Sequence, residues 1–337
     1  MALKKVLLFA IGVALTIYVV GFFGLFEVLA ALAGADLALV GSAVLIQIAV
    51  LGLIVLRLKI LTYGWGYLSL LKTARITMTG MVVSMVTPIA KIGGEPLKIY
   101  MLRQNIGSAH ASVAVAVDSL MEVFSSIFVI FVVTVLFIGA IPQPFFTAFV
   151  LFLVISGLIL GTVLKVLLTP RWMGRIIDWT VKKISRFQEV EEKDYTKLFH
   201  DAFNTMLKDR KKLAGVFAIS IFSKILEIIK IWIIFLALGL ALPSQTVIIA
   251  WAILLVLMFV PWLPGSLGLV EFGVASALVL LGVPGPVGAS GVLVERFMSF
   301  WLVLLIGFLA LSSSRKMGEL PSISKSKIKI SEKEKRS

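Results

Sequence analysis

A set of ionisable residues lies within or beside the long apolar stretches of this sequence. A charged side chain at the centre of a bilayer costs about 2.5–3.5 kcal/mol on insertion scales, so it persists only with a partner, a cavity or a purpose. These residues are therefore the first candidates for chemistry or binding. They are Lys91, Glu95, Lys98, Asp118, Glu122, Lys224, Glu227, Lys230, Glu271, Glu295 and Arg296.

Asp118 and Glu122 form the most suggestive pair, because residues four apart share one face of a helix. Two carboxylates on one face repel each other unless a cation lies between them, and Lys224 or Arg296 could supply it. One interpretation is a polar groove that binds a charged headgroup. The other is a buried structural ion network joining two halves of the protein. The two interpretations are compatible.

The stretch from Pro88 to Glu95, which contains Gly93 and Gly94, interrupts an apolar segment. It could direct a helix N-terminus toward an anion, since free N–H groups and the helix dipole favour negative charge there. Lys91 and Lys98 would add to that attraction. The alternative is a plain re-entrant turn, with both lysines extending to the membrane surface.

A second interruption contains Pro264, Gly265 and Gly268, and Glu271 follows it. The proline and glycines are expected to shape the backbone. Glu271 must either pair with a cation or be protonated, because burial disfavours the charged carboxylate.

Glu227 lies between two lysines at three-residue spacing, Lys224 and Lys230. It is expected to pair within its own helix. The alternative is that these three residues line a pathway.

The composition excludes several kinds of chemistry. The sequence has no cysteine and two histidines, and neither histidine lies in the middle of an apolar span. No cofactor and no metal site are therefore expected, because zinc, haem and acid–base catalysis depend mainly on these residues. A magnesium site at Asp118 and Glu122 remains open.

Hydrophobic residues make up 60% of the chain and charged residues 15%, against about a quarter charged in soluble domains. Several apolar stretches reach the roughly 20 residues that a membrane-spanning helix needs. We predict an all-α, polytopic membrane protein with six full crossings and two broken re-entrant hairpins. The crossings are 6–23, 37–56, 110–137, 146–168, 213–242 and 287–311, and the hairpins are about 58–105 and 246–285.

The distribution of the net charge of +14 predicts the orientation. Lys and Arg are absent from the loops 24–36, 139–146, 242–246 and 282–287, and they gather in the other loops and the tail. Excess Lys and Arg marks the cytoplasmic side. Both termini are therefore expected in the cytoplasm, and the charge is attributed to membrane topology, not to nucleic-acid binding.

The two hairpins share a spacing, which indicates an internal repeat. Pro88 and Glu95 are seven residues apart, and so are Pro264 and Glu271. A further acid recurs 23 residues after Glu95 and 24 after Glu271. Since the hairpins are expected to open to opposite sides, we predict inverted repeats around broken helices, with a site near the midplane between them.

These predictions give one membrane domain, residues 1–312, and a basic disordered tail, residues 313–337. Repeat A is about 58–139 and repeat B about 246–312. Between them lies a cytoplasmic amphipathic insert, 169–212, in which 176–184 has the spacing of a helix lying in the interface and 194–207 is expected to be a second helix.

Three segments resemble the lysylphosphatidylglycerol synthase transmembrane family, also called flippase-like or UPF0104. Residues 87–102, TPIAKIGGEPLKIYML, resemble its P-G-x-x-G-E-x-x-[KR]-x-Y-x-L segment, and 262–273, WLPGSLGLVEFG, resemble P-G-G-x-G-x-x-E. Residues 293–297, LVERF, resemble its closing x-E-R helix. The resemblance covers about 4–312. Two departures are Ile89 for a glycine, and Ser119 for an arginine, for which Lys224 is the expected substitute.

The resemblance implies a lipid flippase without a synthase domain, moving an anionic phospholipid or a polyprenyl-phosphate-linked lipid. The alternatives are an accessory protein or a lipid transferase in a glycolipid pathway, and the oligomeric state is open. The residues that would line or gate the path are Glu95, Asp118, Glu122, Glu271, Glu295 and Arg296.

Overall fold

The computed structural model describes residues 14–18, 21–86, 93–168, 192–258 and 266–320, and these residues are helical, with no strand among them. The prediction of an all-α protein is confirmed. The helices are α2 Leu25–Ala33, α3 Leu37–Thr62, α4 Leu70–Val86, α5 Glu95–Ile106, α6 Ser108–Leu136, α7 Gln143–Leu168, α9 Glu192–Lys208, α10 Arg210–Ala237, α11 Ser244–Met258, α12 Leu269–Leu280, α13 Gly285–Arg296, the π-helical η2 Phe297–Leu302 and α14 Val303–Lys316.

Four stretches are long and apolar enough to cross a membrane: Leu37–Thr62, Ser108–Leu136, Phe145–Thr162 and Gly285–Lys316. Each coincides with a predicted crossing. α10 has 28 residues, but three charged residues interrupt its apolar part. The first predicted crossing, 6–23, lies mostly outside the described residues. The structure is that of a helical membrane protein, and the count of six crossings stays a prediction.

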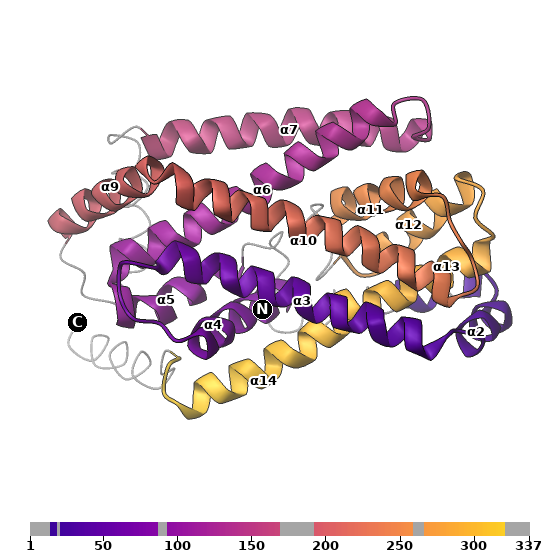
Figure 1. The fold of residues 1–337 in the computed structure, drawn as a ribbon, viewed down its shortest axis with the longest axis horizontal. Coiled ribbons are helices and arrows are strands. Elements are labelled where there is room, and N and C mark those ends of the chain that lie inside the picture. The colour runs from indigo at the N-terminus through magenta and orange to yellow at the C-terminus, as the bar shows by residue number, and fades with distance from the viewer. Residues whose placement is uncertain (1–13, 19–20, 87–92, 169–191, 259–265, 321–337) are drawn as a thin grey trace, which may run out of the picture.

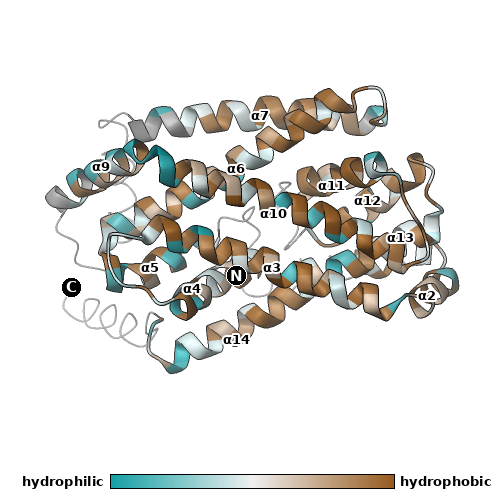
Figure 2. Ribbon diagram, in the orientation of Figure 1, coloured by the Kyte–Doolittle hydropathy of each residue, from teal (hydrophilic) through white to brown (hydrophobic). Residues whose placement is uncertain are grey.

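The long helices run roughly along the long axis of the molecule, and α3 packs beside α10 (Figure 1). The short helices α4 and α5 lie toward one end, and α11 and α12 lie toward the other. We call these the α5 end and the α12 end. Hydrophilic residues are concentrated on α9 and near helix ends, whereas the middle of the molecule is mostly hydrophobic (Figure 2).

The two ends repeat one order of elements, a short helix, a second short helix and a long one. At the α5 end, α4, α5 and α6 have 17, 12 and 29 residues. At the α12 end, α11 and α12 have 15 and 12 residues, and the long stretch 285–316 has 32. The two breaks, at 87–92 and 259–265, lie outside the described residues. The inversion of the repeat stays a prediction.

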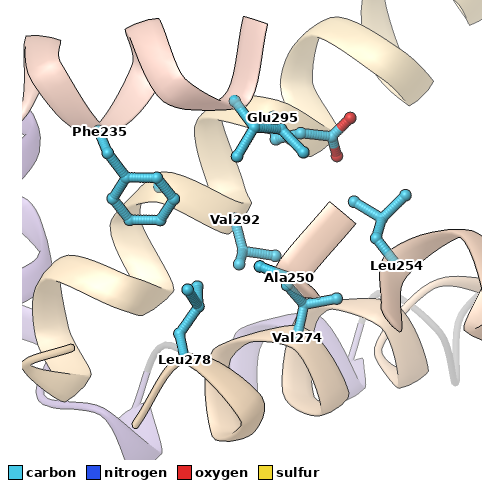
Figure 3. A pocket seen from close by; sticks show the side chains of 9 residues that line it. Phe235, Ala250, Leu254, Val274, Leu278, Val292 and Glu295 are labelled. Carbon is cyan, nitrogen blue, oxygen red and sulfur yellow. The ribbon is translucent and has the colours of Figure 1, made fainter. Parts of the chain in front are cut away.

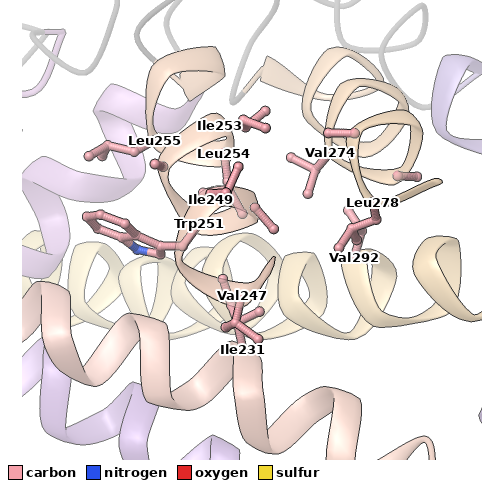
Figure 4. Close-up of a cluster of buried hydrophobic side chains, with 14 of the residues drawn as sticks. Ile231, Val247, Ile249, Trp251, Ile253, Leu254, Leu255, Val274, Leu278 and Val292 are labelled. Atoms are coloured by element: carbon pink, nitrogen blue, oxygen red, sulfur yellow. The ribbon is translucent and has the colours of Figure 1, made fainter. Parts of the chain in front are cut away.

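The largest hydrophobic cluster surrounds α11. Trp251, Ile249 and Ile253 are buried there against Ile231 of α10 and Val274 of α12 (Figure 4). Because α11 is apolar on nearly every side, it is buried among other helices. This cluster holds α10, α11, α12 and α13 together at the α12 end.

α9 packs its apolar face onto α6. Phe199, Phe203 and Met206 are buried there, and the Tyr195 hydroxyl donates to Ser112 Oγ at 2.7 Å. Burial raises the pKa of Tyr195, so the phenol stays a donor at neutral pH. The second helix of the insert is thus present over 192–208. The part expected in the interface, 176–184, lies outside the described residues.

The end of the described chain packs on α4. A Cβ on Gly307 would lie 2.7 Å from Val82 Cβ, and Thr79 Oγ1 lies 3.5 Å from Ser314 Oγ. Beyond the helix, Glu319 accepts from Arg75 Nη1 at 3.3 Å. α14 therefore continues past the domain boundary expected at 312, and residues 321–337 of the predicted tail lie outside the described residues.

Two glycines bring α4 and the start of α5 into direct backbone contact. A Cβ on Gly94 would overlap the Gly80 carbonyl oxygen, and the Gly94 N–H donates to Ser84 Oγ at 2.9 Å. A Cβ on Gly80 would lie 2.5 Å from Lys98 Cγ. The absence of side chains here lets α5 approach α4 and lets the Lys98 side chain pass between them.

Gly94→Ala should destabilise this helix pair, because the new methyl group meets backbone that cannot yield cheaply. Forced overpacking costs about 1–3 kcal/mol. We expect a lower unfolding temperature in detergent, measured by circular dichroism. Gly157→Ala on α7 is the matched control, because its Cβ would meet nothing within 4 Å. Equal unfolding temperatures for the two variants would contradict the close approach.

Candidate functional site

Arg57 of α3 is the centre of a buried group of charges. Its Nε lies 2.6 Å from Asp118 Oδ1, and its Nη1 lies 2.5 Å from Glu122 Oε2. Nη1 also donates to Ser220 Oγ at 3.1 Å. One guanidinium thus joins α3, α6 and α10. We call the first charge cluster the residues Arg57, Glu95, Lys98, Asp118, Glu122 and Lys224.

Lys224 completes the neutralisation of the carboxylate pair. Its Nζ lies 3.0 Å from Glu122 Oε1, on the other oxygen from the one that Arg57 binds. The sequence-based expectation of Lys224 as a cation for this pair agrees with this contact. Where the resemblance led us to expect an arginine at position 119, Arg57 of α3 and Lys224 of α10 bind Glu122 together. Arg296, the other expected cation, lies elsewhere.

Lys98 links α5 to the same cluster. Its Nζ lies 3.2 Å from Glu95 Oε1 and 3.9 Å from Asp118 Oδ2. The residue is 6% exposed, so Lys98 does not extend to the surface as one alternative supposed. α5 begins at Glu95, directly after Gly93 and Gly94, and this start places Glu95 beside Lys98.

A second charge cluster lies nearer the α12 end. Arg296 Nε lies 3.1 Å from Glu271 Oε1, with both side chains 2% exposed. The other Glu271 oxygen accepts from the Gly268 N–H at 2.7 Å and caps α12. Gly268 has a φ of +79°, which favours glycine. Glu271 therefore has a cationic partner. We call the second charge cluster the residues Gln47, Lys230, Glu271, Glu295 and Arg296.

Lys230 connects three helices in the second charge cluster. It donates to Gln47 Oε1 at 2.7 Å and to Glu295 Oε1 at 3.1 Å. The other Glu295 oxygen accepts from Ser299 Oγ at 3.2 Å. Figure 3 shows the Glu295 carboxylate above an apolar lining of a small cavity, to which Phe235 contributes a ring. The charges of the Glu295 carboxylate and the Lys230 ammonium thus neutralise each other in apolar surroundings.

Glu227 corrects one prediction. It does not pair with the lysines of its own helix in the described part of the chain. Instead its Oε2 accepts from Trp251 Nε1 of α11 at 3.0 Å. The reason is the direction in which each lysine of α10 points. Lys224 points to Glu122 of α6, and Lys230 points to Gln47 of α3 and Glu295 of α13. Each lysine is therefore already neutralised by a carboxylate of another helix.

The structure brings together most of the predicted site residues, but in two groups and not one. Pro88, Lys91, Pro264 and Gly265 lie outside the described residues. Sequence reasoning missed Arg57, because the apolar span was expected to end at 56, one residue earlier. It also missed Gln47, which is uncharged. Both are polar residues on an apolar helix, about three turns apart. Two polar residues at this spacing on an apolar helix are the sequence feature that could have identified them as buried site residues.

The first charge cluster contains three cationic and three carboxylate side chains, so its formal charges balance. Arg57 and Lys224 occupy the oxygens of Asp118 and Glu122 that a magnesium ion would need. The first charge cluster is therefore a network of ion pairs that joins α3, α5, α6 and α10. Over the described ranges, no group of three or more His, Cys, Asp or Glu residues could hold a metal ion.

Comparison with known proteins shows the family to which this chain is similar. The profile described as "Lysylphosphatidylglycerol synthase TM region" matches residues 7–307. A UPF0104 membrane protein of Methanothermobacter thermautotrophicus is 28% identical over 322 residues, covering 91% of this chain and 95% of that protein. A UPF0104 membrane protein of Pyrococcus horikoshii is 23% identical over 335 residues, covering 94% and 98%. The similarity thus extends over nearly the whole chain.

Lys230→Met should strongly destabilise the protein, because it leaves Glu295 buried without its cation. Removing one partner of a buried ion pair costs about 3–5 kcal/mol. The matched control is Lys72→Met, which breaks a 3.8 Å pair with Glu319 whose lysine is 27% exposed. Exposed pairs contribute about 1 kcal/mol or less. Thermal unfolding in detergent measures both.

The double variant Lys230→Met, Glu295→Met removes both charges and should recover much of the lost stability, since apolar residues can replace a buried pair. A double variant as unstable as Lys230→Met alone would contradict this explanation.

Proposed function

Since this chain belongs to the lysylphosphatidylglycerol synthase TM-region family, we propose that it moves a lipid across the membrane. The polar headgroup passes along the two charge clusters while the acyl or prenyl tails stay in the bilayer. Members of this profile share a membrane domain, and the proposed substrate is an anionic phospholipid or a polyprenyl-phosphate-linked lipid.

The observation that carries the proposal is the position and exposure of Glu122. It is the middle residue of the 29-residue α6, about 21 Å along the helix from either end. Its side chain is 29% exposed, whereas that of Asp118, one turn away, is 4% exposed. A charged carboxylate at the middle of an apolar helix, open on one side and bound to cations on the other, supports a path for polar headgroups.

The buried pairs add a second argument. A buried ion pair stabilises a fold little, because the desolvation cost offsets the attraction, and well-packed apolar residues often do as well. A protein that keeps both charge clusters between its helices has a use for them other than stability. In the first charge cluster, where the side chain of Glu122 is 29% exposed, an ion pair that exchanges its partner for a charged headgroup provides such a use.

The topology that fits this proposal has six crossings, two broken hairpins in an inverted repeat, and both termini in the cytoplasm. The repeated order of helix lengths at the two ends supports the repeat. Basic residues at the α5 end, among them Lys72, Arg75 and Arg103, support a cytoplasmic position for that end. In transporters built from inverted repeats, the substrate site lies near the midplane between the repeats.

Lipid movement can be tested in proteoliposomes with fluorescent phosphatidylglycerol, quenched from outside by dithionite. We expect the wild-type protein to expose inner-leaflet lipid. Asp118→Asn and Glu271→Gln should slow this movement about tenfold or more, because each removes one charge from the proposed path. A tenfold slowing corresponds to about 1.4 kcal/mol in the transport barrier. Glu319→Gln is the control, since Glu319 pairs with Arg75 outside both clusters.

Wild-type rates in both variants would refute the site assignment. A wild-type protein that moves neither phosphatidylglycerol nor a labelled polyprenyl phosphate would refute transport. The protein would then be better explained as an accessory protein or a lipid transferase.

A further inference from the structure

We infer that Arg57 and Lys224 form a binding site for the phosphate group of a lipid headgroup, with Ser220 positioning Arg57, and that the Glu122 carboxylate occupies this site in the described structure. The inference rests on the proposed function and deepens it. It names the chemical group that is recognised and the residue that competes with it.

Two cationic side chains, from α3 and α10, bind one carboxylate from opposite sides. Arg57 Nη1 and Lys224 Nζ bind opposite oxygens of the Glu122 carboxylate, at 2.5 Å and 3.0 Å. Ser220 Oγ lies 3.1 Å from the same Nη1. Ser220 and Lys224 are four residues apart on α10, so both face α6. The Ser220 hydroxyl accepts from Arg57 and donates to the Val216 carbonyl oxygen, so it holds the guanidinium in place. A guanidinium and an ammonium that converge on two oxygens suit a phosphodiester.

Glu122 and Asp118 differ in how firmly they are held. Asp118 binds Arg57 Nε at 2.6 Å, its side chain is 4% exposed, and Lys98 lies 3.9 Å from its other oxygen. Glu122 is 29% exposed. Asp118 can therefore keep the guanidinium in place while Glu122 turns outward. Asp118 is a positioning residue, and Glu122 is the exchangeable occupant.

The second charge cluster has no equivalent. Glu271 and Glu295 are bound to Arg296 and Lys230 with side chains between 2% and 5% exposed, and Glu271 also caps α12. Neither carboxylate can leave its partner without uncovering a buried charge. The exposed side of Glu122 thus distinguishes the first charge cluster as the place where a phosphate can enter.

The test measures binding to the full-length protein in detergent by isothermal titration. The probes are dihexanoyl phosphatidylglycerol, inorganic phosphate and uncharged dihexanoylglycerol. Glu122→Gln removes the competing charge and nearly preserves the shape of the side chain. It should bind the phospholipid roughly tenfold more tightly than the wild-type protein, as expected for the loss of one competing charge-assisted contact. Dihexanoylglycerol should show no gain.

Two further variants show which cation is responsible. In the Glu122→Gln background, Lys224→Met should abolish the gain, and Lys224→Arg, which keeps the charge, should retain it. Glu319→Gln is the matched control, because it removes a carboxylate paired with Arg75 outside the site, and its binding should equal that of the wild-type protein. Should Glu122→Gln fail to fold, Glu122→Asp, which keeps the charge but shortens the side chain, should show a smaller gain.

Unchanged phospholipid binding in the folded Glu122 variant would overturn the inference. A gain with inorganic phosphate but not with the phospholipid would overturn the assignment to a lipid. The outcome is separate from that of the transport assay: lipid movement by the wild-type protein with no binding gain refutes this site alone. A binding gain without any lipid movement keeps the site and refutes the proposed function.

Discussion

The cost of an unpaired charge away from water determines how this protein is assembled. Arg57 stays protonated at any physiological pH, so helix α3 cannot be buried unless carboxylates from another helix meet it. Asp118 and Glu122 of α6 do so, and Lys224 of α10 balances the second of them. A short series of ion pairs thus constrains the relative positions of α3, α6 and α10.

Close backbone contacts make those ion pairs geometrically accessible. Lys98 reaches Asp118 because Gly80 offers no side chain where the lysine passes, and α5 begins at the right place because Gly94 contacts the Gly80 carbonyl. At the α12 end, Gly268 takes a positive φ and turns its N–H onto Glu271. The ion pairs therefore determine which helices contact each other, and the glycines determine how closely those helices approach.

The sequence predicted the helical class and the four membrane-spanning stretches that could be compared, because long apolar runs indicate both. It also predicted the family, because the two Gly/Glu segments are short motifs that can be recognised without the structure. The partners of the charges were only partly predictable. Lys224 could be assigned to Glu122 because few cations lie in apolar spans. Arg57 could not, since it stands one residue beyond an apolar stretch whose helix continues to Thr62. The bond from Trp251 to Glu227 depends on helix rotation, which composition does not encode.

The packing of α14 on α4 has a consequence for biosynthesis. Thr79 and its neighbour Ser314 are separated by 235 positions along the chain. At about 5–20 residues per second, the ribosome needs on the order of ten seconds or more to make the partner that α4 requires. During that interval Met78 and Val82 lack their final contacts with α14, and this face of α4 must be covered by other helices or by the insertion machinery. Helix α14, the last helix among the described residues, therefore completes the packing around α4, near the start of the chain.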